Sequence, residues 1–476
     1  MRNTDAFAWG MEGDARLRST VVSIVVLDRS PDWEVLTDRF ERVSRQMPMF
    51  RQRVVPTMPP APPRWVYDAD FDLRFHLRRV VAPAPATLDT VLEMARNAEM
   101  GEFDHARPMW TVTLVEGLTD GGAALLVKMH HSLADGIGAL QVATLVFDLQ
   151  PEPADLGPLP PVPAAPAEGP LAGPRRALEY DVALAGRLLK GATIGSARAV
   201  AGGVRHPRSA LRSTVETTAS IYRTVRPINT TSSPIMKDRR MTRELGVHEV
   251  SLPDLKAAGK RAGGSLNDAF LAGITGGLRL YHERHAATLD DLHVTMPISI
   301  RTDGDAEGGN RITLMRFAVA AGVRDPAERI RLVHDATGKA RQEPSLPLTQ
   351  AIAGGLNLLP RWYIAAILRH VDFLASDVPG LPVPVWAGGA AVTMQYAFGP
   401  TIGAGVNVTL FTYQGTCALG INVDTGAVPD FAVFHECLVA GFEEVLELGR
   451  APVADAPPPV VRRRKRPAPP RASTAS

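Results

Sequence analysis

Residues 123–136 read AALLVKMHHSLADG, and this stretch decides the fold. An apolar run ends in two adjacent histidines, His130 and His131, and a short turn then leads through Asp135 to Gly136. The run predicts a β-strand, whereas the apolar spacing after Gly136 predicts a helix. Glycine at this point permits a tight backbone path from the turn into the helix. The order of strand, turn and helix indicates a mixed α/β fold.

The same alternation of patterns continues on both sides of this stretch. In the first part of the chain, the patterns predict strands at 20–27, 110–116 and 123–129, helices at 33–47, 88–100 and 136–149, and extended structure broken by turns at 64–81. In the later part, they predict helices at 267–283 and 326–341 and strands at 293–300, 313–321, 405–411 and 417–423. Strands that alternate with helices in this way favour sheets covered by helices.

The length of 476 residues favours more than one hydrophobic core, and proline marks a boundary between two of them. Nine prolines occur between residues 151 and 174, where neither a helix interior nor a central strand can form. We therefore expect a first lobe (1–150), a Pro-rich linker (151–174), a basic and largely helical connector (175–244), a second lobe (245–450) and a disordered basic tail (451–476).

The composition excludes several classes of protein. Apolar residues make up 45% and charged residues 21%, which is typical of a globular chain rather than a disordered one. No apolar run reaches the roughly 18 residues that a membrane-spanning helix needs. Asp5, Glu12 and Asp14 argue against a signal peptide at the start, and two distant cysteines, Cys417 and Cys437, predict neither a disulfide framework nor a metal site. We expect an intracellular protein that is soluble or peripherally bound to a membrane.

Two segments are strongly basic. Residues 175–240 hold 13 basic and four acidic residues, and beyond Asp455 six basic residues occur without an acidic one. These segments are either simply solvated or bind anionic lipid. Nucleic acid is not an expected partner, because the tail lacks interleaved aromatic residues.

The two histidines are the candidate catalytic residues. Histidine titrates near neutral pH, so a histidine held at the end of a strand is suited to act as a general base. Asp135 can orient an imidazole, or it can anchor the turn through an arginine. Zinc is disfavoured because adjacent histidines point to opposite faces of a strand and no further ligand motif completes a site. Ser132 lies inside the turn and no nucleophile elbow occurs, which argues against serine catalysis.

These residues, with others along the chain, resemble the bacterial wax ester synthase/acyl-CoA:diacylglycerol acyltransferase family, which is related to chloramphenicol acetyltransferase and to condensation domains. The resemblance extends from Asp5 to about Asp430. Besides the H-H-x-x-x-D-G motif, the matching segments are Pro48–Arg53, Pro63–Val66, Arg107–Trp110 with Leu114–Leu118, Ser265–Asp268, Met296–Arg301 and Gly309–Asn310. Several motifs in the family's order are more specific than any one of them alone.

The chain departs from the family's patterns at three places. Residues 377–381 read DVPGL where the family has N-V-P-G-P, so Asp377 replaces an asparagine and Leu381 a proline. A G-P-R-R-like site reads KDRR at residues 237–240, and Met109 stands where leucine is usual. None of these changes touches the presumed base, although the first could alter the substrate channel.

The resemblance implies two chloramphenicol acetyltransferase-like lobes with mixed β-sheets flanked by helices and an active-site channel between them. It implies that His131 is the general base for transfer of a long-chain acyl group from acyl-CoA to the hydroxyl of diacylglycerol or a long-chain fatty alcohol, with no cofactor and no metal. His130 is then expected to be structural, and Asp135 to hold the turn, with Arg301 as its expected partner.

Four further residues belong to these motifs. Asn267 is either an ordinary helix N-cap or, with Asp268, helps to shape the active site. Pro108 and Trp110 are expected in core packing. The substrates suggest peripheral association with the inner face of the cell membrane or with lipid droplets; the oligomeric state stays open.

Two other functions remain possible on the sequence alone. The same histidine motif would serve an acyltransferase with a different hydroxyl acceptor. A catalytically weak paralogue that binds lipid or lipid droplets is the alternative from another class; the intact motif argues against it, whereas Asp377 is in its favour.

Overall fold

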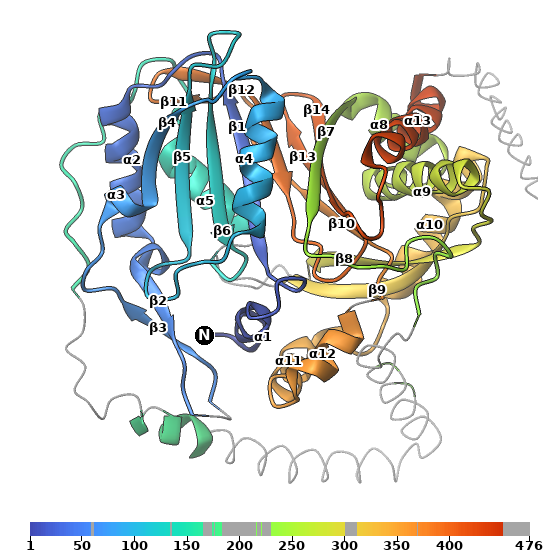
Figure 1. The fold of residues 1–476 in the computed structure, drawn as a ribbon, viewed down its shortest axis with the longest axis horizontal. Helices are drawn as coiled ribbons and strands as arrows, with labels where there is room; N and C mark the ends of the chain where they lie inside the picture. Colours follow the sequence, from blue (N-terminus) through green and yellow to red (C-terminus); the bar gives the residue numbers. More distant parts are fainter. Residues whose placement is uncertain are drawn as a thin grey trace, which may run out of the picture.

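The computed structural model describes residues 1–58, 61–133, 136–164, 174–175, 177–182, 216, 220, 230–299, 312–368 and 370–450. Two six-stranded sheets stand side by side, each with helices packed on it (Figure 1). The expected mixed α/β fold with two lobes is confirmed. Most of the expected connector and the whole tail lie outside the described residues.

The first sheet carries the strand that ends at the histidines. Its strands are β1 (Thr20–Leu27), β4 (Leu77–Val81), β5 (Trp110–Glu116), β6 (Ala123–His130), β11 (Trp386–Ala387) and β12 (Ala390–Phe398), in the spatial order β11-β12-β1-β6-β5-β4. Helices α2 (Trp33–Gln46) and α5 (Gly136–Val146) cover one face, and α4 (Leu88–Met100) covers the other. The remaining elements of this lobe are α1 (Asn3–Met11), α3 (Leu73–His76), a 3-10 turn (Pro48–Arg51) and the hairpin of β2 (Gln52–Val55) and β3 (Arg64–Tyr67).

Helix α2 shows how local sequence builds this lobe. The Asp32 side chain accepts hydrogen bonds from the backbone N–H groups of Glu34 and Val35, at 2.8 and 3.1 Å, and so caps the helix. Leu36, Phe40 and Val43 recur on one face and are buried against the sheet.

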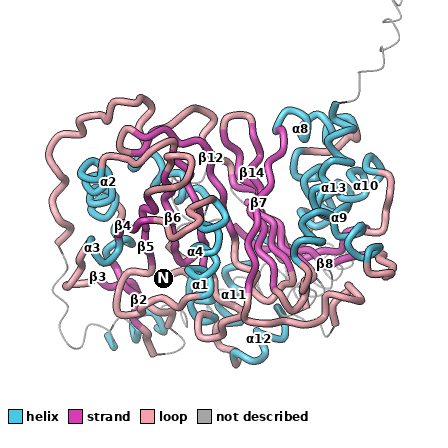
Figure 2. Tube along the Cα trace, turned by 45° about the horizontal axis from the view of Figure 1, so that its top comes forward, coloured by secondary structure: helices cyan, strands magenta, loops and turns pink. Residues whose placement is uncertain are grey.

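The second sheet contains β7 (Arg243–Ser251), β8 (Asp291–Ser299), β9 (Ile312–Ala320), β10 (Phe373–Val378), β13 (Val406–Tyr413) and β14 (Thr416–Asp424), in the order β7-β14-β13-β10-β8-β9. On one face, α8 (Leu252–Arg261), α9 (Leu266–Arg284), α10 (Pro326–Arg341) and α13 (Phe431–Arg450) enclose the largest apolar core. Figure 2 shows these helices grouped on the side away from the first sheet. A 3-10 turn (Leu346–Leu348) leads into α11 (Thr349–Leu356) and α12 (Arg361–Leu368), which lie below the second sheet in Figure 1.

The second half of the chain contributes a strand to the first sheet. Strand β12 belongs to the range expected for the second lobe, yet it pairs antiparallel with β1, with Val22 opposite Phe398 and Ile24 opposite Tyr396. The sheets also approach closely where β12 passes β14. A Cβ atom at Gly420 would lie 1.9 Å from the carbonyl oxygen of Ala397, so only glycine allows this approach.

Helix α4 lies between the two sheets and joins them (Figure 1). Its buried Val91 and Ala95 share one apolar cluster with Leu245 and Ala418 of the second sheet. Arg96 of the same helix forms an ion pair with Glu244 at 3.0 Å. The apolar cluster around α4 therefore contains side chains from both halves of the chain.

The beginning of the Pro-rich linker lies along α2 and is bound by arginine side chains of that helix. Arg39 donates to Asp148 at 2.7 Å and to the carbonyl oxygen of Ala154 at 2.8 Å, and Arg45 donates to that of Pro160 at 2.7 Å. Arginine donors therefore satisfy carbonyl groups that a proline-rich segment cannot pair within a helix or sheet. Across the described part of the chain, every helix is too short or too polar to cross a bilayer.

Candidate active site

A cavity of about 320 Å³ lies between the two lobes. Helix α1 and the turn after β6 form its wall on the side of the first lobe, and β8, β9, β10 and β13 form the opposite wall. Helices α11 and α12 close a third side. His131, Ser132 and Asp5 contribute polar groups, whereas most of the lining side chains are apolar.

Backbone pairing holds His131 at this wall. Thr20 lies opposite His130 at the ends of β1 and β6, and the His131 N–H donates to the carbonyl oxygen of Ser19 at 2.9 Å. The last rung of the sheet thus immediately precedes the imidazole that faces the cavity. A base on a strand end is placed more precisely than one on a free loop.

His130 points away from the cavity into the protein. It is fully buried, and its ring meets Phe103 edge-on at 6.1 Å between ring centroids. The Ser132 N–H donates to its Nδ1 at 3.2 Å, and the Ser132 hydroxyl lies 2.7 Å from the same atom. Because Nδ1 accepts these bonds, the neutral ring carries its proton on Nε2.

Glu12 of the segment after α1 faces that Nε2 atom. Its Oε2 atom lies 3.3 Å from His130 Nε2 and accepts the Ser19 N–H at 3.2 Å. Burial raises the pKa of this carboxyl, but His130, the Ser19 N–H and Arg18 lower it more, so the net pKa lies below the ordinary value. Glu12 is therefore a buried carboxylate that ties the two strand ends together.

The two histidines diverge, as alternation along a strand predicts. One faces the cavity and the other contacts Ser132 and Glu12, so they do not converge on a common point. Within the described residues, no group of three or more His, Cys, Asp or Glu side chains is placed to hold a metal ion.

The rest of the motif is only partly described. Gly136 begins α5, as expected, whereas Asp135 lies outside the described residues. Arg301, its expected partner, also lies outside them. The expected pair of Asp135 and Arg301 therefore stays a prediction.

Pro108 and Trp110 are buried in the first lobe. The indole Nε1 of Trp110 donates to the Phe50 carbonyl oxygen at 2.9 Å, and its ring stacks on His76 at 4.6 Å. Neither residue lines the cavity. Their expected packing role agrees with these contacts.

Asp268 and Asn267 lie at the start of α9, away from the cavity. The N-cap is Ser265, so the interpretation of Asn267 as the cap is wrong. Asp268 completes a capping box with Ser265 and accepts from Thr337 of α10 at 3.0 Å. Neither Asn267 nor Asp268 is among the residues that line the cavity, so the structure does not bring them together with His131.

Several residues of this site were not among the sequence predictions. Asp5 lines the cavity from α1, and burial raises the pKa of its carboxyl. Thr295, Ser376 and Asn407 line it from the second sheet. Such isolated polar residues carry no pattern that sequence reasoning could use; only the packing of α1 and the second sheet against His131 selects them.

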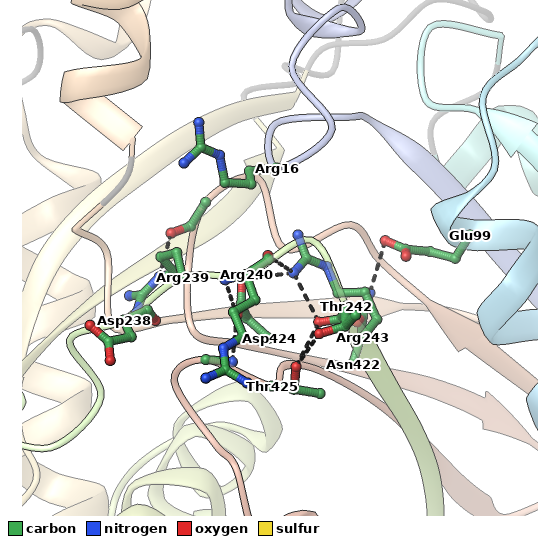
Figure 3. A network of polar contacts seen from close by, with 12 residues as sticks. Arg16, Glu99, Asp238, Arg239, Arg240, Thr242, Arg243, Asn422, Asp424 and Thr425 are labelled. Carbon is green, nitrogen blue, oxygen red and sulfur yellow. Dashed lines mark hydrogen bonds and ion pairs between the residues drawn. The ribbon is translucent and has the colours of Figure 1, made fainter.

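The KDRR segment at residues 237–240 supports the cavity wall. Arg239 donates to the carbonyl oxygens of Gly403 and Val371, at 2.8 and 3.0 Å, and Val371 itself lines the cavity. Figure 3 shows Arg240 and Arg243 gathered around Asp424, and the buried Arg243–Asp424 pair is 2.7 Å long.

Glu99 reaches this network from the other lobe. The Asn422 side chain donates to its Oε1 at 3.4 Å across the boundary between the lobes (Figure 3). Burial raises the pKa of Glu99, despite the lowering effects of Arg243 and Asn422. The bond between Asn422 and Glu99 therefore connects β14 with α4.

Asp377, the departure on β10, does not line the cavity. Its neighbours Leu374 and Ser376 do, and the alternation along the strand turns Asp377 toward the other face. Burial alone raises the pKa of this carboxyl to about 6. The departure therefore lies next to the cavity wall and not in it.

Comparison with protein families gives two matches. The model of the wax ester synthase/diacylglycerol acyltransferase catalytic domain matches residues 1–270. The model of the WS/DGAT C-terminal domain matches residues 308–446.

Two relatives from Mycobacterium tuberculosis match almost the whole chain. A putative diacylglycerol O-acyltransferase is 36% identical, over 93% of this chain and 90% of its own length. A second one is 28% identical, over 95% of this chain and 98% of its own length.

Among solved structures, the chain is similar to the wax ester synthase/diacylglycerol acyltransferase from Marinobacter aquaeolei VT8. The TM-score is 0.61 at 20% identity, and the match covers 94% of this chain and 98% of that one. The first condensation domain of the CDA synthetase gives 0.55 at 15% identity, with 94% and 95% coverage. At these identities both likenesses concern the fold.

Proposed function

This chain belongs to the wax ester synthase/diacylglycerol acyltransferase family, and on that premise we propose that it transfers a long-chain acyl group from acyl-CoA to the hydroxyl of a neutral lipid. It is an acyl-CoA-dependent O-acyltransferase. Diacylglycerol is the acceptor we favour, because the two relatives from Mycobacterium tuberculosis are named for it. A long-chain fatty alcohol, which would give a wax ester, is the second acceptor of this family.

One observation carries the proposal of a mechanism. His131 stands at the wall of a largely apolar cavity that both lobes line. An apolar cavity accommodates acyl chains, and His131 is among the polar residues that interrupt its mostly apolar lining. Two substrates that enter this space meet beside one imidazole.

The reaction follows from that position. His131 takes the proton of the acceptor hydroxyl while the oxygen attacks the thioester carbonyl carbon. The C–S bond then breaks, and the imidazolium returns the proton to the departing CoA thiolate. Because both substrates are held together, no acyl-enzyme is required, and proximity supplies much of the rate. His130 and Glu12 position the strand ends and do not touch the reacting atoms.

Substrate chemistry places the reaction at a lipid surface. Diacylglycerol and long-chain alcohols reside in membranes or lipid droplets, so the protein is proposed to work on the cytoplasmic side, in peripheral contact with one of them. The basic tail, a candidate for this contact, lies outside the described residues.

The test measures release of CoA thiol from palmitoyl-CoA with dioleoylglycerol, with hexadecanol and without acceptor. We expect acceptor-dependent release, and we expect His131→Ala to lower it by roughly 10²–10⁴, the usual contribution of a positioned base. His105→Ala removes an exposed histidine of the same lobe and serves as the matched control.

The possible results separate the alternatives. Equal rates for the wild type and His131→Ala would show that His131 is not the base. Absence of release with either acceptor, combined with retained binding of palmitoyl-CoA, would favour the lipid-binding alternative. Release of CoA thiol with hexadecanol but not with dioleoylglycerol would assign wax ester synthesis instead of triacylglycerol synthesis.

A further inference from the structure

Helices α11 and α12 follow each other closely, and we call them, with residues 357–360 between them, the hairpin; the connection between the helices, its tip, is apolar and exposed. Leu358 and Trp362 expose 60% and 72% of their surfaces, and Leu359 between them exposes 41%. The hairpin lies at the edge of the molecule near α1 (Figure 1). Grouped large apolar side chains on a surface mark a site of contact with a protein, a ligand or a membrane.

The charge of this segment selects among these partners. The sequence from Pro344 to Val371 contains no Asp or Glu, although 50 of the 476 residues are acidic, and Arg361 begins α12. Tryptophan prefers the headgroup level of a bilayer, and basic residues are attracted to anionic headgroups. The hairpin thus combines the residue types of a segment that lies on a membrane surface.

The size of the patch argues against a second copy of this chain. Three side chains bury at most about 250 Å² each. A stable interface needs roughly 800 Å² from each partner. A bilayer has no such minimum, because each inserted side chain adds to partitioning on its own.

The other face of the hairpin leads to the active site. Ile364 and Ala365 share an apolar cluster with Met11 of α1, and the Asn357 side chain donates to the Asn3 carbonyl oxygen at 3.0 Å. On the same hairpin, Ile352, Leu356 and Ile367 line the cavity that contains His131. One short element therefore connects the exposed tip with the reaction site.

We infer that the hairpin tip, formed by Leu358, Leu359 and Trp362, docks onto a phospholipid bilayer, and that the lipid acceptor enters the cavity along this hairpin. The identity of the acceptor rests on the proposed function, whereas the docking can be measured without catalysis. This assigns the contact with the membrane to the folded second lobe, close to the cavity.

The test compares two double variants in flotation with vesicles of equal parts phosphatidylcholine and phosphatidylglycerol. Leu358→Ser with Trp362→Ser removes the tip, and Leu149→Ser with Met241→Ser is the control, because these residues expose 69% and 65% of their surfaces elsewhere. Burial of one large apolar side chain favours partitioning about tenfold or more. The tip variant is therefore expected to bind vesicles about a hundredfold more weakly, and the control within about twofold of the wild type.

Two further measurements complete the design. The ratio of turnover on vesicle-embedded dioleoylglycerol to turnover on dispersed dihexanoylglycerol is expected to fall at least tenfold in the tip variant. Thermal unfolding checks that both variants fold like the wild type. If neither the wild type nor the variants show turnover, the proposed function is wrong, and flotation still tests whether the tip docks onto the bilayer.

Two results would overturn the inference. One is vesicle binding by the folded tip variant that equals that of the wild type. The other is a change of sedimentation from dimer to monomer in the tip variant with unchanged flotation, which would make the tip an interface between two copies.

Discussion

Replacement of Glu12 by alanine tests whether a buried carboxylate holds the strand ends next to His131, the proposed base. In the structure, Glu12 receives the Ser19 N–H at 3.2 Å and faces His130 Nε2 at 3.3 Å, with no exposure to water. Glu12→Ala leaves the buried Ser19 N–H without its acceptor and removes the carboxylate beside His130 Nε2. One unsatisfied buried donor costs about 1–3 kcal/mol, so the expected loss in free energy of unfolding is about 3 kcal/mol.

Activity should fall as well. Ser19 accepts the backbone bond that places His131, and His130 precedes His131 in the chain. A shift of about 1 Å in a catalytic group can cost a hundredfold in rate. We expect kcat of folded Glu12→Ala to fall at least about tenfold, with KM for palmitoyl-CoA within twofold. Urea unfolding and CoA-thiol release measure the two effects.

The isosteric Glu12→Gln variant tests the role of charge. The folded-state pKa of Glu12 is lowered, so its ionic contribution to stability is complete above the ordinary pKa of 4.5 and is lost as the pH falls below it. The stability gap between the wild type and Glu12→Gln should therefore narrow below about pH 4.5. An unchanged urea midpoint in Glu12→Ala, or a loss equal to that of the exposed-site control Glu93→Ala, would refute this reasoning.

Two further predictions concern the second lobe. Asp377→Asn should be more stable than the wild type by about 1–3 kcal/mol at pH 7. Because the folded pKa of Asp377 is about 6, the penalty for its charged carboxylate is small near pH 4 and grows up to about pH 6. Urea unfolding at pH 4 and pH 7 measures the difference in stability between the two proteins, and an equal difference at both pH values would contradict the prediction. Asp268→Ala loses the Asp268 side-chain bonds of the capping box at α9 and the bond to Thr337. We expect its free energy of unfolding to fall by about 2–3 kcal/mol in urea, with unchanged turnover per folded molecule. A selective loss of turnover would instead give Asp268 a role in the active site.

Local patterns predicted many elements closely. The strands at 20–27 and 110–116 and the helices at 88–100 and 326–341 have the same bounds in the structure. Their periodicity and flanking turn residues act over short distances along the chain, which is why they can be read from sequence.

Elements that depend on distant partners were missed. The sequence predictions did not include α1, β7, β10, β12 or the helices after α10. Strand β12 also joins the first sheet instead of the second. No local pattern states which of two sheets a strand will join.

The site shows the same division. The histidines and the helix start at Gly136 follow from the motif and its strand. Glu12 could not be predicted as the partner of His130, because their contact depends on how the N-terminal segment folds back on β1 and β6. The cap at Ser265 could have been predicted, since Ser265 and Asp268 have capping-box spacing.

The place of β12 in the first sheet has a consequence for synthesis on the ribosome. Strand β1 has its partner β6 early, but its other edge stays open until residues 390–398 emerge. At about 5–20 residues per second, that interval lasts roughly 13–50 s after β6 is made. An open edge of apolar β-branched residues is a template for pairing with other nascent chains. The half that carries His130 and His131 therefore closes its sheet only near the end of translation, which makes this enzyme a candidate client for chaperones that shield nascent strands.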